Sequence, residues 1–194
     1  LRFIRNLPNC QVVLGNHDLH LLALYHGVIT RPPSHCLQQV VQAQDSHELI
    51  EWLAQQPLLC HDPHTNSVMV HAGIPPLWDI HTALRHAQTV ETQLRSQPKT
   101  FLSKMYGDEP RRWQPNLTTT DQHRYIINAL TRMRFCQQDG TLNFSNRDCH
   151  STNPLEKPWY HWYKHNTTVF FGHWSTLRGN SQHPKCIALD TGYV

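Results

Sequence analysis

Short apolar runs alternate with amphipathic stretches along much of the chain. Pro57–His61 and Ser67–His71 flank a Pro-His-Thr-Asn turn, and this pattern predicts a β-hairpin. Thr168–Phe171 and Cys186–Leu189 are almost wholly apolar, as buried central strands are. Gln11–Leu14 is a further apolar run that ends at a glycine and predicts a buried strand leading into a loop.

Helical spacing of apolar residues marks four further segments. Each begins at or next to an aspartate, a residue that favours helix N-termini, namely Asp18, Asp45, Asp79 and Asp121. The first helix is expected to stop at Gly27 and the third to extend to about Leu94. The second has an apolar set of Leu49, Ile50 and Leu53, so this set is expected in the core.

The remaining segments predict a second hairpin and a surface insert. Met133–Cys136 and Thr141–Phe144 flank Gln-Gln-Asp-Gly, which is a hairpin pattern. Thr30–Gln44 is polar, contains two prolines and is expected on the surface. Because strands and helices alternate, we expect α/β layers with a helical insert, in a single domain that spans residues 1–194.

The composition is that of a folded, soluble domain. The apolar fraction is 39% and the mean hydropathy is −0.55, values that argue against a disordered or membrane protein. The apolar stretches are too short to span a bilayer, and Leu1–Asn9 lacks the apolar run of a signal peptide, so we expect a cytoplasmic protein. A net charge of +3 is too mild to indicate a protein that binds duplex nucleic acid.

Cysteine and histidine usage narrows the candidate chemistry. The closest two of the six cysteines, Cys136 and Cys149, are thirteen residues apart, which argues against a zinc knuckle or a disulfide framework. We therefore expect free, largely buried thiols. The sixteen histidines are more informative, because imidazole is the side chain most used for metals and proton transfer near neutral pH.

Three polar clusters follow directly after apolar strands. They are Gly15-Asn16-His17-Asp18, His71-Ala72-Gly73 and Gly172-His173-Trp174. Each places an asparagine or histidine at the carboxyl end of a predicted strand, where ligands converge in open α/β sheets. A single histidine at a strand end is more often structural than a ligand, but three glycine-flanked copies favour a metal site built from Asn16, His71 and His173.

In this order the clusters resemble the calcineurin-like phosphoesterases, whose later motifs are G-N-H-D, H-A-G and G-H. Further blocks resemble the symmetrical bis(5′-nucleosyl)-tetraphosphatase family within that superfamily. They are Val13–Leu22, His71–Ile74, Met105–Asp108, Thr131–Cys136, Phe171–Trp174 and Leu189–Gly192. The similarity extends from about Cys10 to Gly192, and the Thr-Arg-Met-Arg-Phe block is the most specific.

The resemblance implies a partial calcineurin-like β-sandwich flanked by helices, and hydrolysis at two divalent metal ions. Asn16, His71 and His173 would be ligands of the second metal. Mn²⁺ is the first choice because mixed oxygen and nitrogen ligation suits it, with Co²⁺ or Mg²⁺ as alternatives. His17 would protonate the leaving phosphate oxygen, with Asp18 fixing its tautomer. The implied reaction cuts diadenosine tetraphosphate and related dinucleotides symmetrically into two nucleoside diphosphates.

Arginines and aromatic residues are candidates for substrate binding. Arg132 and Arg134 alternate on a predicted strand, so they are expected to face opposite sides, and Arg132 is favoured as the polyphosphate ligand. Tyr106, Trp174 and Trp78 are weaker candidates for stacking on adenine, because an aromatic residue beside a strand end is usually part of the core.

The sequence departs from the family pattern in one respect. The earlier motifs, G-D-x-H-G and G-D-x-x-x-R-G, do not occur in these 194 residues. We therefore expect a domain truncated at both ends, with the first metal's ligands and a phosphate-binding arginine elsewhere, and little hydrolysis by this segment alone. Two alternatives stay open: a Ser/Thr-type protein phosphatase of the same superfamily, and a non-catalytic nucleotide-binding protein.

Overall fold

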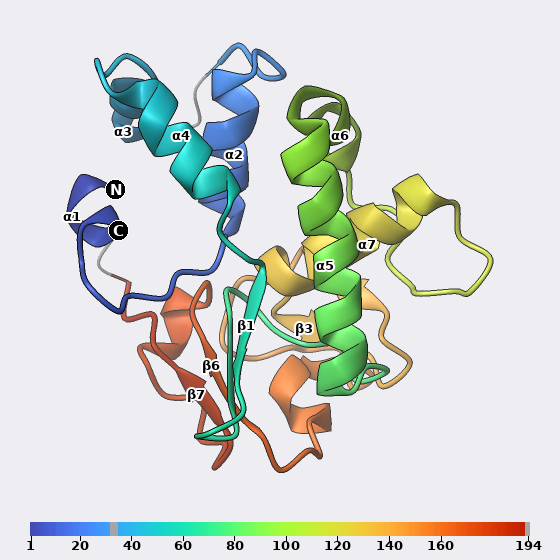
Figure 1. Ribbon diagram of the computed structural model, residues 1–194. Helices are drawn as coiled ribbons and strands as arrows, with labels where there is room; N and C mark the ends of the chain where they lie inside the picture. Colours follow the sequence, from blue (N-terminus) through green and yellow to red (C-terminus); the bar gives the residue numbers. More distant parts are fainter. Residues whose placement is uncertain (32–34, 193–194) are drawn as a thin grey trace.

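The computed structural model describes residues 1–31 and 35–192 (Figure 1). Its helices are α1 (Arg2–Arg5), α2 (Asn16–Tyr25), α3 (His35–Val41), α4 (Ser46–Ala54), α5 (Ile80–Ser96), α6 (Pro98–Met105) and α7 (Thr119–Arg132), with short 3₁₀ turns at Trp159–Trp162 and Ser175–Leu177. In Figure 1, α2, α3 and α4 form one group and α5, α6 and α7 another, with the main sheet below them. Within the described ranges, none of the helices has the length and apolar character that crossing a membrane requires.

The main sheet has four strands in the order β1-β2-β6-β7. The predicted hairpin is confirmed as β1 (Leu59–Asp62) and β2 (Ser67–Val70), which pair antiparallel. β6 (Thr168–Phe171) pairs parallel with β2, and β7 (Cys186–Ala188) pairs parallel with β6. The two apolar runs near the end of the chain are therefore strands of this sheet, as predicted.

A smaller sheet has the order β4-β3-β5. The second predicted hairpin is confirmed, because β3 (Phe135–Cys136) and β4 (Leu142–Asn143) pair antiparallel. β5 (Lys157–Pro158) pairs with the other edge of β3. Two sheets combined with seven α-helices confirm the predicted mixed α/β class among the described residues.

The predicted helices form, with small differences at their starts. Leu49, Ile50 and Leu53 of α4 are all buried, as expected. Asp79 caps α5 by accepting a hydrogen bond from the Thr82 N–H at 2.7 Å. At α7 the N-cap is Thr118, and Asp121 lies in the first turn, so that helix begins slightly earlier than predicted.

Two predicted segments differ from the structure. Gln11–Leu14 was predicted as a strand, but the structure has no strand there. The Leu14 N–H donates to the Pro57 carbonyl at 2.8 Å, and this hydrogen bond is not part of a β-sheet. The surface insert Thr30–Gln44 contains α3, and its residues 32–34 lie outside the described part of the chain. An apolar run of four residues does not specify a strand unless a partner strand lies alongside.

The cysteines are free, but fewer are buried than predicted. Cys136 and Cys186 are buried, whereas Cys10, Cys36 and Cys149 are exposed. Cys10 and Cys149 are exposed because they lie in loops, and Cys36 is exposed because it lies on α3, within the insert that was predicted to be on the surface.

A buried carboxylate anchors α5 to the start of β1. Glu91 is only 8% exposed, and its Oε1 accepts a hydrogen bond from the Leu58 N–H at 2.8 Å. Burial raises the pKa of Glu91, while the Leu58 N–H and the nearby Arg95 oppose the rise. Leu58 is fully buried, so its N–H has no access to water if Glu91 is removed.

Glu91→Ala is expected to lower the free energy of unfolding by about 1–3 kcal/mol, the cost of leaving a buried donor without a partner. Glu91→Gln keeps an oxygen acceptor and is expected to cost less. Urea unfolding measures the difference. Glu51→Ala, at an exposed position on α4, is the control and is expected to stay within about 0.5 kcal/mol of the parent. Equal stabilities for Glu91→Ala and Glu51→Ala would contradict this role for Glu91.

Candidate active site

Parallel pairing of β2 and β6 brings two of the sequence clusters together. The register pairs Val70 with Phe171, so the next residues of each strand, His71 and Gly172, leave the sheet at the same edge. The Gly172 N–H donates to the His71 carbonyl at 2.9 Å. As a result the rings of His71 and His173 lie side by side, with centroids 5.2 Å apart.

The N-terminus of α2 adds the third cluster. Asn16 is the first residue of α2, and its Oδ1 lies 3.0 Å from His71 Nε2. An amide oxygen only accepts hydrogen bonds, so His71 Nε2 is the donor in this state. The close approach requires the glycine at position 15, because a Cβ there would lie 2.6 Å from His71 Cε1 and Nδ1.

Two contacts hold His173, one to its ring and one to its backbone carbonyl. Its φ of +60° lies in the left-handed region, which is uncommon for a residue other than glycine. Nε2 lies 3.1 Å from the Arg132 carbonyl, which can only accept, so Nδ1 carries the lone pair. The Arg134 guanidinium donates to the His173 carbonyl at 3.2 Å.

Both histidines are neutral near pH 7. Burial, reinforced by the neighbouring His17, lowers the pKa of His71 to about 4. Burial, reinforced by Arg134 and His71, lowers the pKa of His173 to about 2. Neutral imidazole is the form that binds metals, so both rings are available as ligands at neutral pH.

Two of the three candidate ligand atoms have a separation that suits one divalent ion, which would take the place of the proton between them. Two ligands bound at right angles to an ion about 2.1 Å away lie about 3.0 Å apart, and Asn16 Oδ1 and His71 Nε2 have that separation. Among the described residues no group of three or more His, Cys, Asp or Glu side chains could hold a metal. The candidate set therefore depends on the Asn16 amide as well as on His71 and His173.

These side chains open into one polar cleft of about 460 Å³. It is lined by Asn16, His17, His20, His71, Arg132, Arg134, Phe144, Arg147, His173, Ser175 and Asp190. His17 is exposed, follows Asn16 in α2 and borders the cleft. The structure thus places three further predicted site residues, His17, Arg132 and Arg134, in the same cleft as the three candidate metal ligands.

Asp18 makes a structural contact at the start of α2. Its Oδ2 accepts a hydrogen bond from the Gly15 N–H at 2.8 Å and so caps α2. Burial raises the pKa of Asp18, and that hydrogen bond and the nearby His17 oppose the rise. This contact fixes the start of the helix that carries His17, and it does not orient the His17 ring directly.

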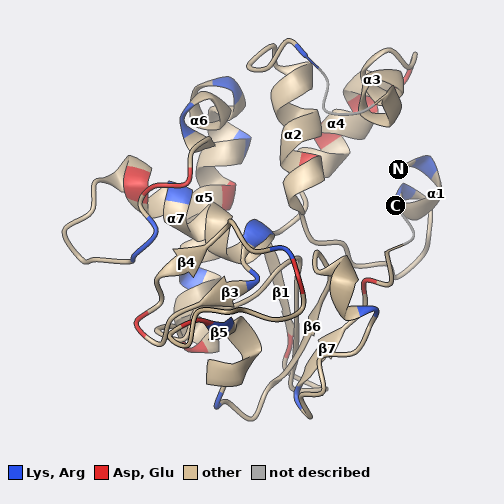
Figure 2. Ribbon diagram, turned by 180° about the vertical axis from the view of Figure 1, so that it is seen from behind, with Lys and Arg blue, Asp and Glu red and all other residues tan. Residues whose placement is uncertain are grey.

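The prediction that Arg132 and Arg134 face opposite sides is wrong. Arg132 is the last residue of α7, and Met133 is the C-cap of that helix. Arg132 is therefore not part of a strand, and the alternation of side chains along a strand does not apply to it. Both arginines line the same cleft, together with Arg147. Figure 2 shows basic segments gathered below α2 and beside β3 and β4.

The arginines differ in their contacts. Arg132 is paired with Asp108 at 2.9 Å, donates to Asn128 Oδ1 at 2.9 Å and lies 4.5 Å from the centre of the Phe144 ring. Burial lowers the pKa of Arg134, and the nearby Arg147 lowers it further. The like charges repel one another, so the cleft attracts an anion.

Two of the three aromatic candidates belong to the core. Trp174 is 1% exposed, packs on Phe135 and donates from Nε1 to the Asp148 carbonyl at 3.0 Å, so its predicted stacking on adenine is wrong. Trp78 is 2% exposed and packs against other aromatic rings, which excludes it for the same reason. Tyr106 is 37% exposed and stays a candidate.

Five residues that line the cleft were not predicted as site residues: His20, Phe144, Arg147, Ser175 and Asp190. His20 lies four residues after Asn16, so both lie on the same face of α2, and this spacing could have indicated it. Arg147 lies in a loop without a local pattern, whereas Asp190 lies in the Leu189–Gly192 block, whose resemblance to the family could have indicated it.

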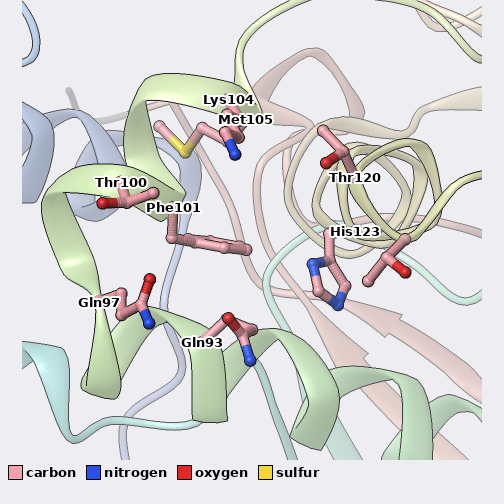
Figure 3. A pocket seen from close by; sticks show the side chains of 9 residues that line it. Gln93, Gln97, Thr100, Phe101, Lys104, Met105, Thr120 and His123 are labelled. Carbon is pink, nitrogen blue, oxygen red and sulfur yellow. The ribbon is translucent and has the colours of Figure 1, made fainter.

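A separate pocket of about 150 Å³ lies among α5, α6 and α7 (Figure 3). Its lining includes Gln93, Phe101, Lys104 and His123, and it contains none of the residues predicted for the site. The candidate chemistry therefore belongs to the cleft beside α2 and not to this pocket.

Gly15→Ala is expected to lower the free energy of unfolding by about 1–3 kcal/mol and to displace the His71 ring, because the site has no room for a methyl group. Urea unfolding and the imidazole NMR signals of His71 measure the two effects. Gly172→Ala is the matched control, since a Cβ there would lie 3.7 Å from the His71 carbonyl, an ordinary contact. Equal responses to both substitutions would contradict the packing argument.

Comparisons with known proteins identify the family of the chain. No protein-family model matches the chain. The chain is 45% identical to the symmetrical bis(5′-nucleosyl)-tetraphosphatase of Aeromonas hydrophila, with 100% of this chain and 73% of the relative covered. It is 42% identical to the protein of that name from Colwellia psychrerythraea, with 100% and 75% covered, and 43% identical to that from Pseudomonas putida, with 100% and 70% covered.

One solved structure supports the fold. "Crystal structure of a putative diadenosine tetraphosphatase" matches with a TM-score of 0.56 and 24% identity, over 98% of this chain and 62% of that chain. At this identity the likeness concerns the fold alone. The identities to the three relatives, over the whole of this chain, establish the family. The chain belongs to the family of symmetrical bis(5′-nucleosyl)-tetraphosphatases.

Proposed function

We propose that the protein hydrolyses diadenosine tetraphosphate and related dinucleoside polyphosphates symmetrically, to two nucleoside diphosphates. The observation that carries this proposal is the convergence of two neutral imidazoles and an amide oxygen beside three arginines in one cleft. The relatives' shared name supports this substrate class over the protein-phosphatase alternative. A cytoplasmic location is part of this proposal, because the six free cysteines would stay reduced there.

Asn16, His71 and His173 would hold a divalent metal ion in this proposal. The separation of Asn16 Oδ1 and His71 Nε2, and the neutrality of both imidazoles, support the assignment. We propose Mn²⁺, with Co²⁺ or Mg²⁺ as alternatives, because the donors mix oxygen and nitrogen. Two bound ions in the complete site would activate water and polarise the phosphoryl oxygens.

The arginines would bind the polyphosphate. Planar guanidinium groups form paired, charge-assisted hydrogen bonds with phosphate oxygens. Arg132 was favoured from the sequence, but Asp108 already pairs with it, and we propose Arg134 as the stronger candidate. Burial and the nearby Arg147 disfavour the charge of Arg134 until an anion binds. Arg132, whose guanidinium Asp108 and Asn128 hold in place, would contact the same chain from the neighbouring wall.

His17 would transfer the proton that the leaving group needs. Its ring is exposed at the cleft next to Asn16, where a bound phosphate oxygen would be within reach. Capping of α2 by Asp18 fixes the backbone that carries His17. General acid catalysis of this kind accelerates a reaction by about 10²–10⁴-fold.

His17→Ala, in the protein that carries these residues, is expected to slow nucleoside diphosphate release from diadenosine tetraphosphate by about 10²–10⁴-fold. Its metal content is expected to stay unchanged, because His17 is not among the proposed ligands. His81→Ala, an exposed histidine at the start of α5, is the control and is expected to retain full activity. His71→Ala is expected to lose metal. Loss of metal from His17→Ala would show that His17 is a ligand instead.

Arg134→Ala is expected to raise the KM for diadenosine tetraphosphate by about 10–150-fold, the value of a lost hydrogen bond to a charged group. Steady-state kinetics at two salt concentrations measure the change, and the variant is expected to depend less on salt than the parent. Arg85→Ala, at an exposed position on α5, is the matched control. An unchanged KM would exclude Arg134 from polyphosphate binding.

A further inference from the structure

An apolar pocket of about 210 Å³ adjoins the polar cleft. The two share Asn16, His20 and Arg132, so they are continuous around the N-terminal half of α2. The apolar part of the pocket is formed by Leu19, Met105 and Ile127, which lie on α2, α6 and α7 and are buried. A ligand with a charged end and an apolar end would therefore meet matching surfaces at this junction.

Tyr106 forms one wall of the pocket, paired with His20. Their rings are nearly parallel, with an interplanar angle of 16° and centroids 5.5 Å apart. Tyr106 Oη lies 2.9 Å from His20 Nδ1, so the hydroxyl fixes the orientation of the ring. Burial raises the pKa of Tyr106 to about 12, which keeps the hydroxyl protonated at neutral pH. Tyr106 is 37% exposed as a residue and borders the pocket, so its side chain is accessible to a ligand.

Arg132 forms the boundary between pocket and cleft. Asp108 and Asn128, both on the pocket side, each bond its guanidinium at 2.9 Å. Asn128 also donates from Nδ2 to the Gly107 carbonyl at 2.9 Å. The polar side chains at this boundary are therefore hydrogen-bonded to protein groups, whereas the Tyr106 ring presents an apolar surface to the pocket.

We propose that this apolar pocket binds one nucleobase of the substrate, stacked on the Tyr106 ring. The proposal rests on the proposed function and adds a base subsite to it. A nucleotide has a planar aromatic base joined to a phosphate chain, and the pocket joins an aromatic wall to a cleft that contains three arginines. Aromatic side chains bind bases by stacking, and a ring that is already fixed loses little entropy on binding.

The contacts in the pocket also indicate its selectivity. Asp108 and Asn128 bond Arg132, and Asn128 bonds the Gly107 carbonyl, so these groups are not aimed at the edge of a base. Stacking alone tolerates different bases because each has an aromatic face. Adenine and guanine nucleotides are therefore expected to bind with similar affinity.

Calorimetric titration with ADP and with inorganic pyrophosphate tests the subsite, because ADP adds a nucleoside to the same diphosphate. The parent protein is expected to bind ADP more tightly than pyrophosphate. Tyr106→Ala is expected to weaken ADP binding by about 5–150-fold, the value of one base–aromatic stack, without changing pyrophosphate binding. Tyr106→Phe keeps the ring and is expected to bind ADP much as the parent does.

Tyr25→Phe is the matched control for Tyr106→Phe. Tyr25 lies at the other end of α2 and its hydroxyl is 3.1 Å from His47 Nδ1, so the substitution removes a similar contact away from the cleft. ADP binding is expected to be unchanged. Thermal unfolding checks that each variant is folded.

Three results would overturn the base subsite. The first is that the parent binds ADP and pyrophosphate with equal affinity. The second is that Tyr106→Ala weakens the binding of both ligands equally, and the third is that it weakens the binding of neither. If Tyr106→Ala does not fold, NMR of the parent bound to ADP replaces that variant as the test. Nuclear Overhauser effects between the adenine protons and the Tyr106 ring are expected, and their absence would overturn the proposal. A parent that binds ADP through Tyr106 but does not cleave diadenosine tetraphosphate would overturn the proposed function and leave the subsite standing.

Discussion

Parallel, in-register pairing of β2 with β6 is the constraint on which the rest of the site depends. It places His71 and Gly172 at the same sheet edge and links them by a hydrogen bond of 2.9 Å. The His71 and His173 rings are neighbours because of this pairing. A shift of one residue between the strands would turn one of the clusters away from the cleft, because side chains alternate between the two faces of a sheet.

Two glycines allow other elements to close onto this edge. A Cβ at position 15 would lie 2.6 Å from the His71 ring, and a Cβ at position 73 would lie 2.7 Å from the Trp159 ring. The first contact seats α2 beside the strand end, and the second packs the chain after β2 against a fully buried tryptophan. Glycine in these two clusters is thus required by close packing, independently of any chemistry.

Electrostatics divides the cleft into unlike parts. Burial keeps His71 and His173 neutral, while Arg132, Arg134 and Arg147 gather on the neighbouring wall. Asp108 balances part of this positive charge by pairing with Arg132. A polyphosphate would add the negative charge that the arginines lack, and α2 connects this charged region to the apolar pocket beside Tyr106.

The sequence by itself determined the elements that depend on local pattern: both hairpins, the buried face of α4 and the three glycine-flanked clusters. Only the tertiary structure decided which side chains meet, because Asn16 and His71 are 55 residues apart and come together through strand pairing and helix docking. The strand alternation assumed from the sequence gave the wrong orientation for the Arg132 side chain, because Arg132 is the last residue of a helix. Burial of Trp174 and the position of Arg147 at the cleft also depend on distant packing, which a local pattern does not encode.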